Sequence, residues 1–185
     1  MKKGRLTAIV GCMFSGKTEE LVRLVRREKY ANRKALFFKP DIDTRYSKDK
    51  VVSHSGVEED ATCISVEKPD AIFEYITDDI DVVGIEEVQF FCPEILSVVN
   101  ELIERGVDIF VCGLDLDYRG ELFGQTHKLM ALADKGLKLS AICMVDGCGN
   151  KASRTQRLSK EEGTVVIGET DKYQARCRDH YIAPK

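Results

Sequence analysis

Short apolar runs alternate along this chain with longer stretches in which apolar residues recur every three or four positions. Residues 8–10, 35–38 and 82–85 are apolar runs of the kind that form buried strands. Between the first two, residues 19–33 place leucine and valine on one face and arginine on the other, which predicts a helix. Strands and helices that alternate at this spacing indicate an α/β fold, with a mostly parallel sheet covered by helices on both faces.

The same alternation continues over the middle of the chain. Residues 61–66 and 107–112 are further strand candidates, and residues 70–76 are a candidate for a short helix. A second long helix is predicted over residues 93–106, because a proline suits its first position and apolar residues recur at helical spacing up to a glycine. Residues 127–135 are a third helix candidate.

Two segments depart from this alternation. Residues 41–60 are polar and are predicted to form a long loop. Residues 139–144 could add a strand, but the chain that follows is short and rich in glycine and cysteine, without another amphipathic helix. We therefore expect a boundary near residue 140, between an α/β domain over residues 1–140 and a small lobe over residues 141–185.

Composition and charge restrict the classes of partner. Of the 185 residues 43% are hydrophobic, which is enough for one packed domain with a small appendage. A net charge of −3 supplies no overall positive field for a nucleic-acid backbone. No run of about 18 apolar residues predicts a membrane span, and the N-terminal segment lacks the features of a signal peptide. We expect a cytoplasmic protein without a nucleic-acid or membrane partner.

Seven cysteines divide into two groups. An odd count without a secretory signal argues against a disulfide framework. Four cysteines lie in or beside apolar stretches and are expected to be small core residues, as free cysteine commonly is: Cys12, Cys63, Cys92 and Cys112. The other three lie near the C-terminus and belong to a different pattern.

Residues 11–18 read Gly-Cys-Met-Phe-Ser-Gly-Lys-Thr and match the phosphate-binding P-loop motif at every fixed position. In such a loop, successive backbone N–H groups converge on phosphate oxygens at the N-terminus of the next helix. Lys17 would place a positive charge on the outer phosphates of ATP, and the Thr18 hydroxyl would ligate Mg²⁺. The α/β domain is therefore predicted to be P-loop NTPase-like, with nucleotide-binding positions Gly11, Cys12, Met13, Phe14, Ser15, Gly16, Lys17 and Thr18.

Two adjacent acids, Glu86 and Glu87, follow the predicted strand over residues 82–85. A P-loop needs an acidic residue at the end of a neighbouring strand to help hold magnesium. Adjacent residues on an extended segment point in opposite directions, so one acid would face the metal and the other an acceptor hydroxyl, whose proton it could take. The alternative, two solvated acids at a polar strand end, remains open at this point.

Cys143-x4-Cys148 and Cys177-x2-His180 form two ligand pairs separated by 28 residues. Both spacings suit structural zinc, and four such donors fill a tetrahedron without an open position. We therefore expect a structural ion on which the small lobe depends for folding. The alternative is three unrelated cysteines and a surface histidine.

The P-loop, the strand that ends in two acids followed by Gln-Phe-Phe, and the zinc lobe together resemble the thymidine kinase family of the cellular and bacterial type. The resemblance extends over nearly the whole chain, at residues 11–18, 43–46, 86–91, 113–115, 132–134, 152–158, 166–168 and 171–173 and at the four expected zinc ligands. It implies transfer of the γ-phosphate of ATP to the 5′-hydroxyl of deoxythymidine, giving dTMP and ADP.

The resemblance also implies roles for individual residues. Glu87 matches the general base that activates the 5′-hydroxyl, and Glu86 matches the magnesium residue, where aspartate is more common. Asp43 and Arg45 match a segment near the phosphates, with Arg45 a candidate for stabilising the transferred group. Gln89 lies in the same motif as the two acids and is grouped with the nucleotide-binding positions.

On the acceptor side the resemblance implies an aromatic residue and a closing loop. Tyr118 matches the residue that packs on the thymine ring, and Tyr173 matches a contact to the deoxyribose end of the pocket. The loop that closes over the base, largely through backbone hydrogen bonds, would comprise Thr155 and the run Thr164, Val165, Val166, Ile167 and Gly168. The family is typically homotetrameric and is inhibited by dTTP.

Two other classes of function remain open. A P-loop switch or motor ATPase is one, although the chain lacks the Asn-Lys-x-Asp motif that reads guanine and is short for a motor. A zinc-lobe nucleic-acid binder is the other, since four C-terminal arginines make that region locally basic. These side chains are expected to be solvated or to face phosphate: Arg154, Arg157, Arg176 and Arg178.

Overall fold

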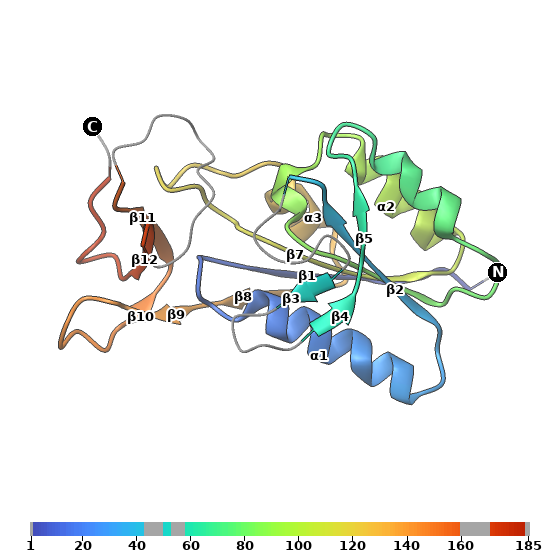
Figure 1. Ribbon diagram of the computed structural model, residues 1–185, viewed down its shortest axis with the longest axis horizontal. Helices are drawn as coiled ribbons and strands as arrows, with labels where there is room; N and C mark the ends of the chain where they lie inside the picture. The colour runs from blue at the N-terminus through green and yellow to red at the C-terminus, as the bar shows by residue number, and fades with distance from the viewer. Residues whose placement is uncertain (1, 43–49, 53–57, 160–170, 184–185) are drawn as a thin grey trace.

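The computed structural model describes residues 2–42, 50–52, 58–159 and 171–183. Its centre is a six-stranded sheet with the order β5-β2-β6-β7-β1-β8, in which every neighbouring pair is parallel (Figure 1). Apolar β-branched and aromatic residues fill the central strands, as expected where both faces of a parallel sheet are covered. The strands are β1 (Leu6–Gly11), β2 (Ala35–Pro40), β5 (Thr62–Ile64), β6 (Val82–Ile85), β7 (Asp108–Gly113) and β8 (Lys135–Leu139).

Helix α1 (Lys17–Tyr30) covers one face of this sheet, and Figure 1 shows it on the opposite side from α2. Its buried side chains recur at helical spacing, with Leu21 and Val25 packed against Ile9 and Phe37 of the strands. The exposed face carries glutamate and arginine, including the pair Glu20 and Arg23. The face of α1 that was predicted from the sequence is therefore the face that is buried.

The other face is covered by three helical segments. These are the 3₁₀ helix η1 (Pro69–Tyr75), α2 (Ile95–Glu104) and α3 (Thr126–Leu132), and together with the strands they form the larger of the hydrophobic clusters. Leu102 of α2 and Leu129 of α3 are fully buried there. The predicted class, a mostly parallel α/β sheet with helices on both faces, is confirmed.

Several predicted boundaries were wrong. The polar segment 41–60 contains an antiparallel hairpin of β3 (Lys50–Val52) and β4 (Glu58–Asp60), because pairing between strands outweighs its polar composition. Helix α2 begins at Ile95 rather than at the proline. The third helix ends at Leu132, since Lys135 already belongs to β8, which pairs with β1 along its length.

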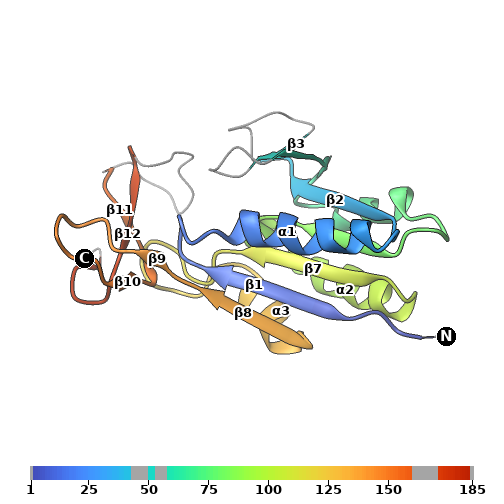
Figure 2. The ribbon, with the colours of Figure 1, turned by 90° about the horizontal axis from the view of Figure 1, so that it is seen from below.

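The C-terminal segment forms two small antiparallel sheets beyond the carboxyl ends of the parallel strands, at the left of Figure 2. One pairs β9 (Ala141–Ile142) with β10 (Lys151–Ala152), and the other pairs β11 (Arg154–Arg157) with β12 (Tyr173–Arg176). The strand predicted over residues 139–144 is thus divided, since β8 ends the main sheet and β9 starts a separate one. Within the described ranges, no helix is both long and apolar enough to cross a membrane.

Replacing Leu102 with alanine should lower the free energy of unfolding by about 2–5 kcal/mol, because the cavity left under α2 cannot collapse onto the β-sheet. Leu132→Ala is the matched control, since its side chain is 56% exposed whereas Leu102 is fully buried. Chemical denaturation of both variants measures the difference. Equal losses of stability would contradict the packing of α2 described above.

Candidate active site

The turn between β1 and α1 is held close to the end of the neighbouring strand. A Cβ atom on Gly11 would lie 2.5 Å from the Leu139 carbonyl oxygen and 2.8 Å from Ser15 Oγ, so only glycine fits. Gly16, the residue before α1, has a φ of 80°, in the left-handed region that glycine adopts without strain. The turn therefore reverses sharply and directs the N-terminus of a 14-residue helix toward the carboxyl edge of the sheet.

Two residues at the start of α1 point back into this edge. Lys17 is 7% exposed, and its Nζ donates a 2.9 Å hydrogen bond to the Cys12 carbonyl oxygen. The Thr18 hydroxyl donates a 2.7 Å hydrogen bond to a carboxylate oxygen of Glu86, 68 positions later in the chain. A hydroxyl and a carboxylate in contact at a helix N-terminus are oxygen ligands of the kind that Mg²⁺ prefers.

Glu86 and Glu87 do not continue the extended strand as predicted. Strand β6 ends at Ile85, and Glu87 adopts the left-handed conformation, with φ 49° and ψ 45°, before the short 3₁₀ helix η2 (Val88–Phe90). The two carboxylates nevertheless have different partners. Glu86 is buried against Thr18, whereas Glu87 is partly exposed and accepts a hydrogen bond from the Gln89 side-chain amide.

Gln89 connects the ends of two adjacent strands. Its side chain is buried, donates to Glu87 and accepts a 3.0 Å hydrogen bond from the Leu114 backbone N–H, just beyond β7. Gly124 packs so closely that a Cβ there would lie 2.0 Å from the Gln89 carbonyl oxygen. In addition, Phe90 and Phe123 meet edge-to-face at 5.6 Å. The loops that follow β6 and β7 are therefore fixed to each other.

The loop after β7 carries Tyr118 and is held by a buried acid. Asp117 Oδ1 accepts hydrogen bonds from the backbone N–H groups of Arg119 and Glu121, at 2.8 and 3.0 Å. The Tyr181 hydroxyl, from the C-terminal lobe, donates a 2.7 Å hydrogen bond to the Tyr118 carbonyl oxygen. The position of Tyr118 thus depends on both parts of the chain.

Arg157 lies between the two tyrosines that were assigned to the acceptor. Its guanidinium carbon lies 3.6 Å from the centre of the Tyr118 ring, and its Nη2 donates a 3.1 Å hydrogen bond to the Tyr173 hydroxyl. The expectation of a solvated or phosphate-facing side chain was wrong for Arg157, which is buried in these contacts. The sequence did hold a signal for it, because alternation along β11 puts Arg157 on the same face as Thr155.

The C-terminal lobe packs directly on the residues of the P-loop motif. The Thr155 hydroxyl accepts a 3.1 Å hydrogen bond from the Met13 backbone N–H. The Cys12 thiol lies 3.3 Å from the Ala152 carbonyl oxygen and donates to it. Burial raises the pKa of this thiol, which keeps it in the protonated form that donates the bond. Residues 11–18 therefore contact the main sheet on one side and the lobe on the other.

The three C-terminal cysteines and His180 converge on one point. The donor atoms of Cys143, Cys148, Cys177 and His180 all lie within 4.8 Å of one another. Cys148 Sγ and Cys177 Sγ are 3.8 Å apart, and His180 Nδ1 lies 3.3 Å from Cys177 Sγ. Tetrahedral zinc, with bonds of about 2.3 Å to sulfur and 2.0 Å to nitrogen, requires such separations of about 3.5–3.8 Å. The cluster therefore fits a closed metal site.

The electrostatics favour the ionised form of one sulfur of the cluster, Cys143, whereas its neighbours raise the pKa of the Cys148 thiol. Burial opposes ionisation of Cys143, but backbone N–H groups of Cys177 and Val145 and the side chain of His180 outweigh it and lower the pKa of that thiol to about 6. Metals bind the thiolate form of cysteine, so Cys143 is ready to ligate at neutral pH. No disulfide competes for these sulfurs, since all seven cysteines are free.

A model of the thymidine kinase family matches residues 4–181 of the 185-residue chain. The chain belongs to the thymidine kinase family. The match spans the parallel sheet, residues 11–18, the two acids and the four-residue metal cluster together. Membership supports a kinase that phosphorylates thymidine, and the resemblance noted in the sequence is confirmed.

Some of the thymidine kinase positions assigned from the sequence lie outside the described residues. They are Asp43 and Arg45 on the phosphate side, and Thr164, Val165, Val166, Ile167 and Gly168 on the acceptor side. Among the described positions, the structure brings Lys17, Thr18 and Glu86 to one edge and joins Tyr118 to Tyr173 through Arg157. Phe90 and Phe123 were not assigned from the sequence, because nothing in their spacing predicts the contact between their loops.

The four other cysteines were expected in the core, and only two are there. Cys12 and Cys112 are buried, whereas Cys63 and Cys92 are partly exposed. Burial, followed by the nearby charges of Glu86 and Glu87, raises the pKa of the Cys112 thiol well above its usual value. Cys112 is therefore a neutral core residue under the two acids rather than a nucleophile.

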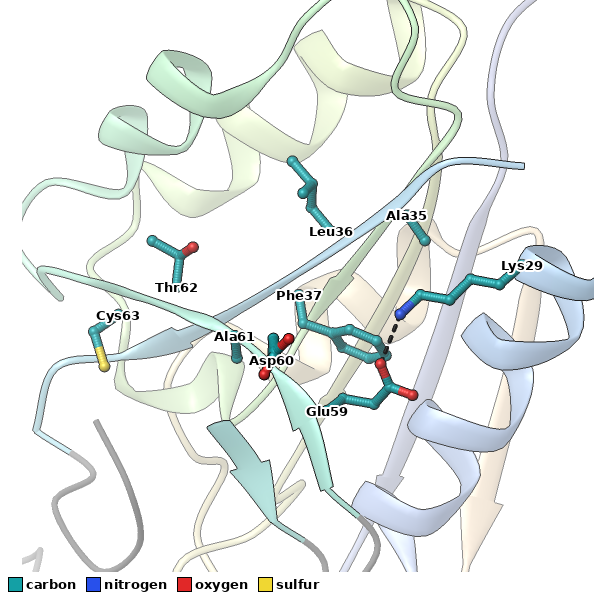
Figure 3. Close-up of a pocket in the computed structure, with 9 residues that line it drawn as sticks. All are labelled: Lys29, Ala35, Leu36, Phe37, Glu59, Asp60, Ala61, Thr62 and Cys63. Atoms are coloured by element: carbon teal, nitrogen blue, oxygen red, sulfur yellow. Dashed lines mark hydrogen bonds and ion pairs between the residues drawn. The ribbon is translucent and has the colours of Figure 1, made fainter. Parts of the chain in front are cut away.

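A cleft of about 660 Å³ opens at the β2–β5 edge of the sheet, away from these residues (Figure 3). It is bordered by Lys29, which lies 12 positions beyond Lys17 and so about 18 Å along α1 from the turn that follows β1. Its acid Glu59 already pairs with Arg26 and Lys29 at 2.5 and 2.6 Å. The cleft therefore lies apart from the residues that gather at the carboxyl edge of the sheet.

If a metal occupies the cluster, its removal should make the Cys12 thiol accessible to alkylation, because the segment that covers Cys12 would lose its fold. Cys112 is the internal control, since it is equally buried but lies within the main sheet. Purified protein is treated with a thiol reagent with and without chelation, and each site is quantified by peptide mass spectrometry. If Cys12 stayed as protected as Cys112 after complete metal removal, this dependence would be wrong.

Proposed function

We propose that this protein transfers the γ-phosphate of ATP to the 5′-hydroxyl of deoxythymidine, giving dTMP and ADP. The observation that carries the proposal is the contact between Thr18 and Glu86, with Glu87 next in the chain. It brings a metal-ligand pair and a second carboxylate to the N-terminus of the helix that follows a P-loop sequence. Phosphoryl transfer needs this combination of phosphate cradle, metal ligands and base.

The donor would bind along residues 11–18. Backbone N–H groups of the turn and the positive end of the α1 dipole attract phosphate oxygens. Lys17 would exchange its bond to the Cys12 carbonyl for the outer phosphates. Thr18 and Glu86 would hold Mg²⁺, which neutralises phosphate charge when bound. We extend the donor site to Asp43, Arg45 and Gln89 on the basis of the family resemblance.

On the acceptor side we assign the general base to Glu87. Its carboxylate is partly exposed, in contrast to Glu86, and the bond from Gln89 restricts its rotamer. A carboxylate in this position could take the proton of the 5′-hydroxyl as that oxygen attacks phosphorus. Tyr118, Thr155, Tyr173 and residues 164–168 would hold the nucleoside, with the lid excluding water.

We further propose that Zn²⁺ occupies the cluster of Cys143, Cys148, Cys177 and His180 in a structural role. All four donors would be used, which leaves no position for substrate. We keep residues 1–140 and 141–185 as the two proposed units of the chain. A homotetramer and inhibition by dTTP are proposed from the resemblance alone, and a cytoplasmic location is proposed from the sequence.

Replacing Glu87 with glutamine should lower kcat for dTMP formation by about 10²–10⁴, because the amide cannot accept the proton. ATP affinity should change little, since the phosphate cradle is intact. Glu104→Gln, on the exposed end of α2, is the matched control and should retain full turnover. A Glu87→Gln enzyme with near-normal kcat would remove this residue from the chemistry.

Replacing Lys17 with alanine should reduce transfer by roughly 10²-fold or more, because one positive contact to the transferred phosphate is lost. Lys128→Ala, an exposed lysine on α3, serves as the control. The assay offers magnesium-ATP with a panel of nucleosides and scores 5′-monophosphates. ATP hydrolysis that proceeds equally without any nucleoside would favour an ATPase instead and overturn the proposed function.

A further inference from the structure

Arg157 takes no part in the proposed chemistry, yet it is the residue through which Tyr118 and Tyr173 meet. Its guanidinium carbon is 3.6 Å from the centre of the Tyr118 ring and 5.5 Å from the centre of the Tyr173 ring. A hydrogen bond of 3.1 Å joins its Nη2 to the Tyr173 hydroxyl. Only 9% of the residue is exposed. A cation buried in this way needs partners that replace its water, and the two phenol rings are among them.

The geometry uses properties that are particular to arginine. A planar guanidinium can stack on one ring while its N–H groups donate in the same plane to a second group. Lysine carries the same charge on a single ammonium and cannot do both. The strand register supports the arrangement, since Arg157 and Tyr173 are directly opposite in the antiparallel pair of β11 and β12.

We propose that Arg157 is a positioning residue for the nucleoside, holding Tyr118 and Tyr173 as one preformed wall against which a flat pyrimidine base packs. Tyr118 lies on the loop after β7 and Tyr173 on β12, so the wall joins the main domain to the lobe. A wall that is ordered before binding costs less entropy when the base arrives. This inference rests on the proposed function, because it assigns these two tyrosines to the acceptor.

A role of this kind has a kinetic signature. Arg157 contacts neither residues 11–18 nor the two acids in any hydrogen bond described here, so its loss should weaken nucleoside binding without changing ATP binding or the chemical step. Arg119 provides an internal contrast on the same ring. Its guanidinium carbon lies 5.2 Å from the Tyr118 ring centre, and its Nε donates a 3.0 Å hydrogen bond to the Tyr118 hydroxyl. Because the Arg119 side chain is exposed, water screens both interactions.

The test compares Arg157→Met, Arg157→Lys and the control Arg119→Met in the full-length, metal-loaded protein. Both Arg157 variants should raise the KM for deoxythymidine about tenfold, with kcat and the KM for ATP nearly unchanged. Arg157→Lys should not restore the KM for deoxythymidine to that of the parent, because lysine keeps the charge but cannot stack as a planar group. Arg119→Met should behave like the parent, and zinc content and circular dichroism should be the same for all four proteins.

A binding measurement separates this inference from the proposed function. Equilibrium dialysis of deoxythymidine without ATP should show the same tenfold weakening for Arg157→Met, whether or not the parent protein turns over. The chain has six tyrosines and no tryptophan, so tyrosine fluorescence can follow the same titration. Failure to phosphorylate despite binding would overturn the kinase proposal alone, whereas absence of nucleoside binding by the parent would overturn both.

A double-mutant cycle tests whether Arg157 acts through Tyr118. In a Tyr118→Leu background, Arg157→Met should weaken deoxythymidine binding much less than in the parent, since the ring it positions is gone. If Tyr118→Leu and Arg157→Met weaken deoxythymidine binding by independent factors that multiply in the double variant, the proposed wall is wrong. It is also wrong if Arg157→Lys binds nucleoside normally.

A second variant serves if Arg157→Met fails to fold. Tyr173→Phe removes only the hydroxyl that accepts the hydrogen bond from Arg157. That variant should then weaken nucleoside binding by about threefold, and unchanged affinity would overturn the proposal.

Discussion

The parallel arrangement of six strands constrains everything else in this molecule. In a parallel sheet all carboxyl ends lie along one edge, so the segments that follow β1, β6 and β7 must converge however far apart they are in sequence. The hydrogen bond from Thr18 to Glu86 and that from Leu114 to Gln89 are the direct result. Because β6, β7 and β1 are consecutive in the sheet, the glycine turn after β1, two acids and an aromatic loop meet without any long connection.

The C-terminal segment depends on contacts with the residues that follow β1. Its hydrophobic cluster consists mainly of alanines and cysteines with Val145, and is completed by Cys12 and Phe14 from the turn after β1. Side chains of this size bury too little apolar surface to hold a small sheet by themselves. The metal site and the turn together therefore replace the missing core. As a consequence, two hydrogen bonds join the phosphate end of the proposed site to the base end. One runs from Met13 to Thr155 and the other from Cys12 to Ala152.

What the sequence predicted correctly was local or strongly periodic. Residues 11–18 join a strand to a helix as expected, the buried face of α1 follows helical spacing, and the members of each Cys/His pair of the cluster lie within six residues. The failures needed information from distant parts of the chain. The polar residues of β3 and β4 become strands only because they pair with each other. Lys135 leaves the helical pattern to pair with β1, and Arg157 is buried because Tyr118 arrives from another domain segment.

The conformation of Glu87 shows how the site departs from the simplest reading of its sequence. Continued extension of β6 would have directed the two acids to opposite faces of the sheet. Instead the chain turns left-handed at Glu87, a conformation that costs a non-glycine residue about 1–3 kcal/mol. The hydrogen bond from Gln89 to the carboxylate and the 3₁₀ turn that follows offset this strain. Since Gln89 is itself held by the backbone beyond β7, the orientation of the proposed base is set by the adjacent strand. The strained backbone at Glu87 thus lets its carboxylate face a different group from Glu86, which bonds Thr18 at the N-terminus of α1.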